Sequence, residues 1–227
     1  MSRIRYNTSY RQALKQKILD TAILLFSERG VKAVKMDDIS NSLSISKRTL
    51  YEIYDNKEDL FFECVKKRFE ESERELSKSV ANAENVMDIL ICIYRMKIDA
   101  LEKTHPSFYY EIEKYPKILA YFDQQNADKQ KLQMDFIQRG IREGFFRSDV
   151  NYRLAFCLFD VSNRYVITNF KTFNYSMEQV FYNLIFVFLR GFCTIKGIEV
   201  LDKFIEEDSK MLQLKRNLSM MTGKTEN

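Results

Sequence analysis

The sequence predicts an all-α protein, in which a group of short N-terminal helices precedes a larger helical region. Two observations lead to this prediction. The 227 residues include only two prolines, Pro106 and Pro116, and six glycines, too few for the regular turns of a many-stranded β fold. Hydrophobic residues make up 45% and charged residues 30%, a mixture typical of a folded globular chain, and its long segments without breakers favour helices.

The first predicted helix runs from about Tyr10 to Glu28. Gly30 follows it and is suited to end the helix in a left-handed conformation. Apolar residues recur along one face of this segment at helical spacing, namely Ile18, Ala22, Leu25 and Phe26.

Two short helices and a connecting turn are predicted next. Asp37 and Asp38 begin the first, because carboxylates favour a helix N-terminus, and Ser46 is a good N-cap for the second. A turn of about four residues between two short helices is typical of a helix-turn-helix. Asn56 then caps a fourth helix, which continues through Phe69.

The third helix, KRTLYEIY, has the side chains that a helix in the DNA major groove requires. Lys47 and Arg48 can donate to guanine O6 and N7, and the methyl group of Thr49 can contact a thymine methyl. Hydroxyl and ammonium groups around this helix can bond phosphate oxygens, which fixes position without reading sequence; these candidates are Lys35, Ser46, Tyr51, Tyr54 and Lys57. The alternative for the two tyrosines is packing against the first helix.

Charge is distributed unevenly along the chain. The whole sequence has a formal net charge of +4, whereas residues 1–54 hold ten Lys/Arg and five Asp/Glu, so the rest is slightly negative. An anionic partner for the first quarter of the chain would explain this excess. An ordinary solvated helix surface is the alternative explanation.

The sequence offers little for metal binding or catalysis. His105, just before Pro106, is the only histidine, and its position suggests a surface or capping residue. We expect no metal site and no cofactor, because no CxxC pair exists. An apolar helical context predicts buried free thiols for all four cysteines, which are Cys64, Cys92, Cys157 and Cys193.

Enzymatic and membrane functions are also unlikely from the sequence. It contains no nucleophile elbow and no glycine-rich phosphate loop, so we expect no enzyme. The polar, basic N-terminus does not resemble a signal peptide, and the most apolar run, Val180–Leu189, is shorter than the ~20 residues of a membrane helix. We therefore expect a cytoplasmic protein with no membrane partner.

The segment Ile18–Val65 resembles the N-terminal DNA-binding domain of the TetR family of bacterial transcription regulators. The helix ILDTAILLFSERG ends in the family's Phe-x-x-x-Gly pattern, and VKMDDIS matches its Thr/Ser-x-x-x-Ile-Ala region. ISKRTLYEIYDNKEDL matches the recognition helix and the Phe-x-x-Lys-x-x-Leu link. In this chain Met36 and Ser40 replace the commoner Thr and Ala. Ser44 replaces a common Gly, so a positive φ there would be strained.

The predicted organisation has two domains. Residues 1–56 form a helix-turn-helix domain, which the fourth helix (57–78) links to a helical effector-binding and dimerisation domain (79–227). The expected helices of this second region are Val86–Lys103, Ser107–Tyr115, Lys117–Glu143, Tyr152–Thr172, Met177–Ile195 and Glu199–Glu207, followed by a mobile tail from Ser219.

The helix Met177–Ile195 is apolar around nearly its whole circumference. A helix at a protein surface has only one apolar stripe, so something must cover its outer side. A second copy of the chain is the simplest cover, and the resemblance implies dimerisation through the last two long helices; a buried central helix in a monomer is the alternative. Two related recognition helices would read an inverted-repeat operator. The predicted interface residues are Phe181, Leu184, Ile185, Phe188 and Phe192.

The resemblance also implies a cavity for an unknown small-molecule effector. An effector that favours the conformation with separated recognition helices would release DNA, so we expect a ligand-responsive repressor. The alternative is a helical small-molecule-binding or adaptor protein with a degenerate DNA-binding head. Candidate cavity residues, for which ordinary core packing is the alternative, are Ile93, Tyr94, Met96, Phe108, Tyr109, Phe122, Met134, Phe136 and Phe159.

Overall fold

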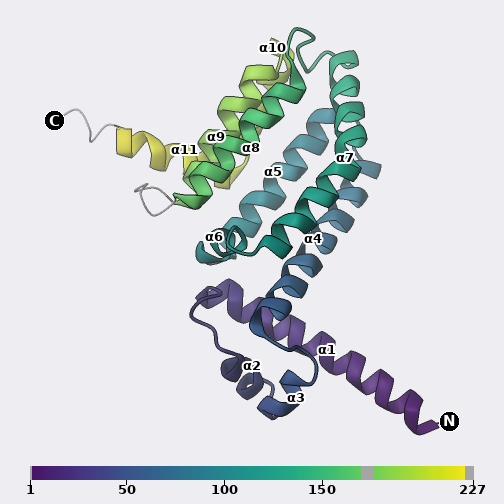
Figure 1. Ribbon diagram of the computed structural model, residues 1–227. Coiled ribbons are helices and arrows are strands. Elements are labelled where there is room, and N and C mark those ends of the chain that lie inside the picture. Colours follow the sequence, from purple (N-terminus) through teal and green to yellow (C-terminus); the bar gives the residue numbers. More distant parts are fainter. Residues whose placement is uncertain (1, 170–175, 223–227) are drawn as a thin grey trace. The chain divides into compact units, whose positions relative to one another are not determined.

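The computed structural model describes residues 2–169 and 176–222, without the side chains of residues 2–8, 127, 128, 184, 185 and 218–222. The regular elements of the described residues are all helices (Figure 1), which confirms the all-α prediction. They are α1 (Ser2–Arg29), α2 (Met36–Ser42), α3 (Lys47–Tyr51), α4 (Lys57–Ala81), α5 (Val86–Glu102), α6 (Ser107–Ile112), α7 (Pro116–Arg142), α8 (Tyr152–Thr168), α9 (Met177–Phe192), α10 (Ile195–Glu207) and α11 (Ser209–Thr222).

The helices form two compact units that do not follow chain order. The head unit consists of Met1–Arg74 and Glu102–Asp123, and the C-terminal unit consists of Glu75–Leu101 and Gln124–Asn227. The short helix α6 therefore belongs to the head unit, although about 30 residues of the C-terminal unit precede it in the chain.

The head unit is built on one hydrophobic core. Phe61 of α4 lies at its centre, with edge-to-face contacts to Phe26, Phe108 and Tyr115 at ring-centroid distances of 5.6, 5.2 and 5.4 Å. Residues of α1 to α4 surround these rings, and α6 and the start of α7 complete the core. The buried members are Leu14, Ile18, Leu19, Ala22, Leu25, Phe26, Val31, Val34, Met36, Ile39, Leu50, Tyr54, Leu60, Phe61, Cys64, Val65, Phe108 and Ile118.

Polar contacts fasten the segment before α6 to the end of α1. The guanidinium group of Arg68 donates to Oγ of Ser27 at 3.2 Å and to Oγ1 of Thr104 at 2.9 Å. The backbone N–H of His105 donates to the carbonyl oxygen of Ser27 at 2.6 Å. Nδ1 of His105 lies 3.2 Å from the backbone nitrogen of Ser107, at the start of α6. His105 is exposed and caps α6, as its position before Pro106 suggests.

The C-terminal unit has its own core. Its helices pack around Phe146, which contacts Phe136 and Phe192 at ring-centroid distances of 5.7 and 5.9 Å. An antiparallel bridge joins Phe146 to Cys193. The buried members of this core are Val86, Met87, Ile137, Phe145, Phe146, Tyr152, Leu189, Cys193 and Leu201.

Some helix boundaries differ from the sequence-based prediction. Helix α1 begins at Ser2 rather than near Tyr10. Helix α9 ends at Phe192 because Cys193 is extended and Thr194 caps α10. Helix α11 occupies part of the expected tail; the carboxylate of Asp208 accepts backbone N–H groups at its start. The helix expected over Tyr152–Thr172 corresponds to α8, and its expected end at Thr172 lies outside the described residues.

The thiol prediction is correct only in part. Cys64 and Cys193 are buried, Cys92 is half-buried, and Cys157 is exposed. The apolar sequence around Cys157 predicts burial, but Cys157 lies on the face of α8 that also exposes Leu154 and Leu158. Among the described residues, no helix is long and apolar enough to cross a membrane.

Candidate nucleic-acid interface

The turn between α2 and α3 is short and tightly bonded. The backbone N–H of Ser44 donates to the carbonyl of Asn41 at 3.1 Å, and that of Ile45 donates to the carbonyl of Ser40 at 3.0 Å. Ser44 has a φ of 51°, a left-handed conformation that costs a residue with a Cβ about 1 kcal/mol. The family's glycine would avoid this cost, so the serine places strain inside the turn.

Helix α3 has a well-formed N-terminus. Oγ of Ser46 accepts the backbone N–H of Thr49 at 3.0 Å, the expected N-cap bond. The two hydroxyl groups of these residues lie 2.8 Å apart and share a hydrogen bond. Leu50 is fully buried and anchors α3 in the head core. The N-terminal turn of α3 is thereby held rigidly while its charged side chains remain outside.

The two cations of this turn point outward, and each is held by a carboxylate. Arg48 has 89% of its side chain exposed, and its Nε lies 3.0 Å from a carboxylate oxygen of Glu52. Lys47 is also exposed and forms an ion pair with Asp37 of α2. The hydrogen bond and charge of Asp37 raise the pKa of Lys47. Both pairs are at the surface, where such interactions are weak, so a phosphate or base edge can displace the carboxylates.

The flanking candidates differ in exposure. Lys35 is exposed directly before α2, and its backbone N–H donates to Asp38 at 2.7 Å. Lys57, at the start of α4, is less exposed because it is half-buried, and its Nζ lies 5.9 Å from the ring centroid of Phe26. Burial lowers the pKa of Lys57.

Sequence reasoning missed two residues at this site. Asp37 holds Lys47, although its sequence position suggested only a role at the helix N-terminus. Arg11 of α1 donates to the carbonyl oxygen of Glu52, just after α3, at 2.8 Å. No local pattern could have revealed the second contact, because 41 residues separate its partners.

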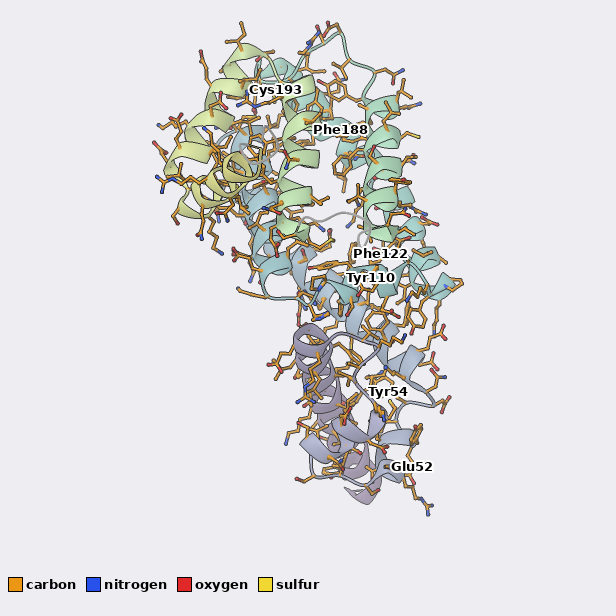
Figure 2. All side chains as sticks on the ribbon, turned by 90° about the vertical axis from the view of Figure 1, so that its left-hand side faces the viewer. Glu52, Tyr54, Tyr110, Phe122, Phe188 and Cys193 are labelled. Carbon is orange, nitrogen blue, oxygen red and sulfur yellow. The ribbon has the colours of Figure 1, made fainter. Side chains whose placement is uncertain are left out.

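The two tyrosines have different environments. Tyr51 has 46% of its surface exposed, on the same short helix as the outward-pointing cations. Tyr54, labelled in Figure 2, is 4% exposed and belongs to the head core. The expectation that Tyr54 faces outward toward phosphate is therefore wrong. Its position corresponds to the Phe of the Phe-x-x-Lys-x-x-Leu pattern, a signal that could have predicted its burial.

The hydroxyl group of Tyr54 is buried and has no hydrogen-bond partner among the described residues, and burial raises its pKa far above the usual range. Replacing Tyr54 by Phe should therefore raise the free energy of unfolding by about 1 kcal/mol, because an unsatisfied buried hydroxyl is removed. It should leave DNA binding unchanged. Urea unfolding and titration with a duplex would measure the two effects.

Tyr51→Phe is the matched control for this substitution. Its hydroxyl is solvent-accessible, so its loss should leave stability unchanged and weaken binding to all duplexes alike. An equal loss of DNA affinity in the Tyr54 variant would contradict the buried position of that side chain.

The predicted effector residues are distributed over both units. Phe108, Tyr109 and Phe122 belong to the head unit, and the other six belong to the C-terminal unit. The C-terminal unit contains a small apolar cavity of about 10 Å³, to which only Tyr94 of the nine contributes. The cavity is lined by Leu90, Ile91, Tyr94, Phe186, Leu189, Leu201 and Phe204.

The hydroxyl group of Tyr94 is buried and has no hydrogen-bond partner in the described structure. Burial raises its pKa above the usual range, so the phenol stays neutral. Its ring lies among Phe181, Phe186 and Phe204, with centroid distances of 6.0, 5.8 and 5.9 Å.

The predicted interface residues of α9 are partly covered within their own unit. Phe181, Phe188 and Phe192 are half-buried, and Phe188 contacts Phe159 of α8 at a centroid distance of 5.3 Å. The side chains of Leu184 and Ile185 lie outside the described residues. A further apolar surface lies along α8, the other of the two long helices through which the resemblance implies dimerisation. Its exposed residues repeat at spacings of three or four and are Leu154, Leu158, Val161 and Tyr165.

Comparisons with known proteins agree with this geometry. Residues 18–64 match the family model described as bacterial regulatory proteins, tetR family. The HTH-type transcriptional repressor KstR2 of Rhodococcus jostii is 25% identical over 155 residues, which cover 66% of this chain and 76% of the relative. The biofilm operon negative regulator IcaR of Staphylococcus epidermidis is 48% identical over 56 residues, which cover 25% of this chain and 30% of the relative.

Solved structures show the same fold over most of the chain. The ketosteroid regulator KstR2 of Mycobacterium tuberculosis aligns with a TM-score of 0.53 and 20% identity, covering 79% of this chain and 95% of that one. A putative regulator from Saccharomonospora viridis in complex with choline aligns with a TM-score of 0.63 and 18% identity, covering 81% and 99%.

The family match therefore coincides with the segment that forms the later part of α1, α2, α3 and the start of α4, in which the second helix of the helix-turn-helix carries an exposed basic turn. The repressor relatives extend the likeness well beyond that segment. The chain therefore carries a TetR-family helix-turn-helix DNA-binding head, and its repressor relatives are transcription regulators rather than enzymes.

Proposed function

We propose that the protein is a ligand-responsive repressor that binds an inverted-repeat operator as a homodimer in the cytoplasm. The observation that carries this proposal is the N-terminal turn of α3. Ser46 caps it, Leu50 anchors it, and Arg48 projects into solvent. A rigid, exposed and basic helix N-terminus is what major-groove recognition requires.

Each candidate side chain has a distinct role in this proposal. Lys47 and Arg48 donate to guanine acceptors after leaving their carboxylate partners, and Thr49 contacts a thymine methyl. Ser46, Tyr51, Lys35 and Lys57 contact phosphates and set the position of the head on the duplex. Tyr54 has no contact role, because its side chain is in the core.

We propose the following division of labour. Residues 1–56 bind DNA, and residues 79–227 bind the effector and dimerise. Helix α4 connects these two parts. The inclusion of α6 in the head unit supports a transmitting role for this helix, since it lies between the effector-binding helices α5 and α7 in the chain.

The exposed apolar residues of α8 support a homodimer. Leu154, Leu158, Val161 and Tyr165 form one stripe, and Val187 of α9 is also exposed. Burying one such side chain contributes roughly 1.5–3 kcal/mol. Covering the whole stripe with a second copy of the chain would therefore stabilise the dimer substantially. Such a dimer presents two recognition helices related by a two-fold axis, which suits an operator with half-sites about 34–36 Å apart.

The C-terminal unit is proposed to bind an apolar effector that carries a hydrogen-bonding group. The cavity of about 10 Å³ has room for about one water molecule, so the effector must open it. The buried hydroxyl of Tyr94 can then satisfy its hydrogen bond with the ligand. Structural neighbours bound to choline and to resorcinol support small-molecule binding by this fold, and the repressor relatives support the sign of regulation.

Selection from a random duplex library tests the DNA-binding proposal. We expect the wild-type protein to enrich an inverted repeat, with affinity that falls steeply as salt rises. Arg48→Ala should cost about 1–3 kcal/mol on the enriched sequence and relax the preference at one position in each half-site. An unchanged preference would remove the base-reading role of Arg48.

The oligomeric state and the competing function are tested with the same material. Sedimentation at micromolar concentration should give the mass of two chains, and Leu158→Asp should shift it toward one. If the wild-type protein retains no duplex even at low salt, the head is degenerate and the alternative of a helical small-molecule-binding or adaptor protein takes its place.

A further inference from the structure

We propose that the N-terminal part of α1, residues 2–13, is a second DNA-binding element that contacts phosphates of the duplex beside the half-site read by α3. We call this segment the arm. The inference deepens the proposed function and rests on it, because it concerns how far the protein extends along its operator.

The charge of the arm and of the turn that follows it is of one sign. Residues 2–17 contain five cations and no aspartate or glutamate, and the first acidic residue of the chain is Asp20. Duplex DNA carries one negative charge per about 1.7 Å of its axis. The five cations are Arg3, Arg5, Arg11, Lys15 and Lys17.

The arm extends beyond the head core as a continuous helix. Helix α1 begins at Ser2, and Leu14 is the first buried residue among the side chains of this helix that the structure describes. The described side chains before Leu14, from Ser9 to Ala13, are all exposed. A helix over residues 2–13 is about 18 Å long, and Figure 1 shows this part of α1 projecting past α2 and α3. The side chains of residues 9–13 do not contribute to the core, so packing in the head does not explain why the helix continues through them.

A hydrogen bond to the residue that follows the recognition helix places the arm on the side needed for DNA. The guanidinium group of Arg11 donates to the carbonyl oxygen of Glu52, directly after α3, at 2.8 Å. The arm therefore leaves the head beside the C-terminal end of α3. When the N-terminal turn of a recognition helix enters the groove, its other end lies nearer the phosphate backbone. The arm thus begins where phosphates lie.

The composition of the arm favours DNA over other occupants. A helix that binds a lipid surface or packs on a partner helix requires a continuous apolar face. The arm has only Ile4 and Ala13 as aliphatic residues. Its partner is therefore a polyanion that is engaged through charge, and the duplex held by α3 is the polyanion within reach.

A charge-neutral arm tests the inference. The double variant Arg3→Gln with Arg5→Gln is compared with Lys131→Gln with Arg142→Gln, which changes the net charge equally on exposed positions of α7. Each protein binds the selected operator trimmed to its half-sites, and the same operator with flanks of about one helical turn, roughly 10 bp. Affinity is measured between 50 and 200 mM salt.

We expect the arm variant to bind the trimmed duplex like wild type. On the flanked duplex, the slope of log affinity against log salt should fall by roughly 1.8 for each protomer bound, the release expected for two phosphate contacts. The α7 variant should match wild type on both duplexes. Circular dichroism and thermal unfolding should show both variants folded, because glutamine favours a helix about as well as arginine and lysine do.

Two results would overturn the inference while leaving the proposed function intact. In one, the arm variant matches wild type on the flanked duplex. In the other, the α7 variant loses as much as the arm variant, so that only bulk charge matters. If wild-type protein binds no duplex, the proposed function fails and the inference falls with it.

Discussion

Replacing Phe61 by alanine should lower the free energy of unfolding by about 3–5 kcal/mol, the usual cost of removing a fully buried phenylalanine. Phe61 has no exposed surface and contacts the rings of Phe26, Phe108 and Tyr115. These partners come from α1, from α6 and from the residue before α7, so the substitution removes the centre of the head core. DNA binding should be lost at temperatures where wild type still binds.

Phe62→Ala provides a matched control on the same helix. Phe62 is half-buried, with one edge-to-face contact to Tyr121 at 5.8 Å. Phe62→Ala should lower the free energy of unfolding by less than half as much as Phe61→Ala, because less apolar surface returns to water. Urea unfolding at a fixed protein concentration would measure both values, since the stability of the proposed dimer depends on protein concentration. An equal or larger loss for Phe62→Ala would contradict the described core.

Replacing Gly30 by alanine should lower the free energy of unfolding by about 2–4 kcal/mol, for two separate reasons. Gly30 has a φ of 81°, which is unfavourable for a residue with a Cβ. An added Cβ would also overlap the hydroxyl oxygen of Ser107 and lie 3.0 Å from Nδ1 of His105. The segment before α6 is held against α1 at this point by the hydrogen bond from the backbone N–H of His105 to the carbonyl oxygen of Ser27, so it cannot withdraw freely.

Gly144→Ala separates the two causes. Its φ is 78°, nearly the same, but nothing lies within 4 Å of an added Cβ. It should cost only about 1–2 kcal/mol, the conformational penalty alone. The difference between the two variants, measured by urea unfolding, reports the close approach of α6 to α1. Equal losses would mean that this approach is absent in solution.

The DNA-binding head could be predicted from sequence in considerable detail. Ser46 caps α3, Gly30 ends α1 with a positive φ, and Ser44 adopts the strained φ that the missing glycine implies. Capping and turn preferences are local, because they depend on the backbone within three or four residues. These preferences can therefore be predicted from a short segment of the sequence.

Exposure was less predictable, as Tyr51 and Tyr54 demonstrate. They are three residues apart and chemically identical, yet one is exposed and the other lies in the core. Helix α3 ends at Tyr51, so helical spacing does not relate the two positions. The core formed by α1 and α4 decides which ring is covered.

Contacts between distant segments could not be predicted at all. Lys47 pairs with Asp37, and α11 is held to α5 by the ion pair of Lys210 with Asp99 at 2.5 Å. Such ion pairs depend on how the helices pack. The sequence alone is compatible with many different pairings of its exposed charged residues. The scattering of the predicted effector residues over two units has the same cause.

By itself, the sequence determined the helical class, the helix-turn-helix and the family, because periodicity, caps and turn residues act over short distances. Only the tertiary structure decided that Tyr51 is exposed, that α6 belongs to the head and that α8 exposes an apolar stripe. Burial depends on which segments pack together in space. The free energy of burying their apolar surface comes from residues that are far apart in the chain.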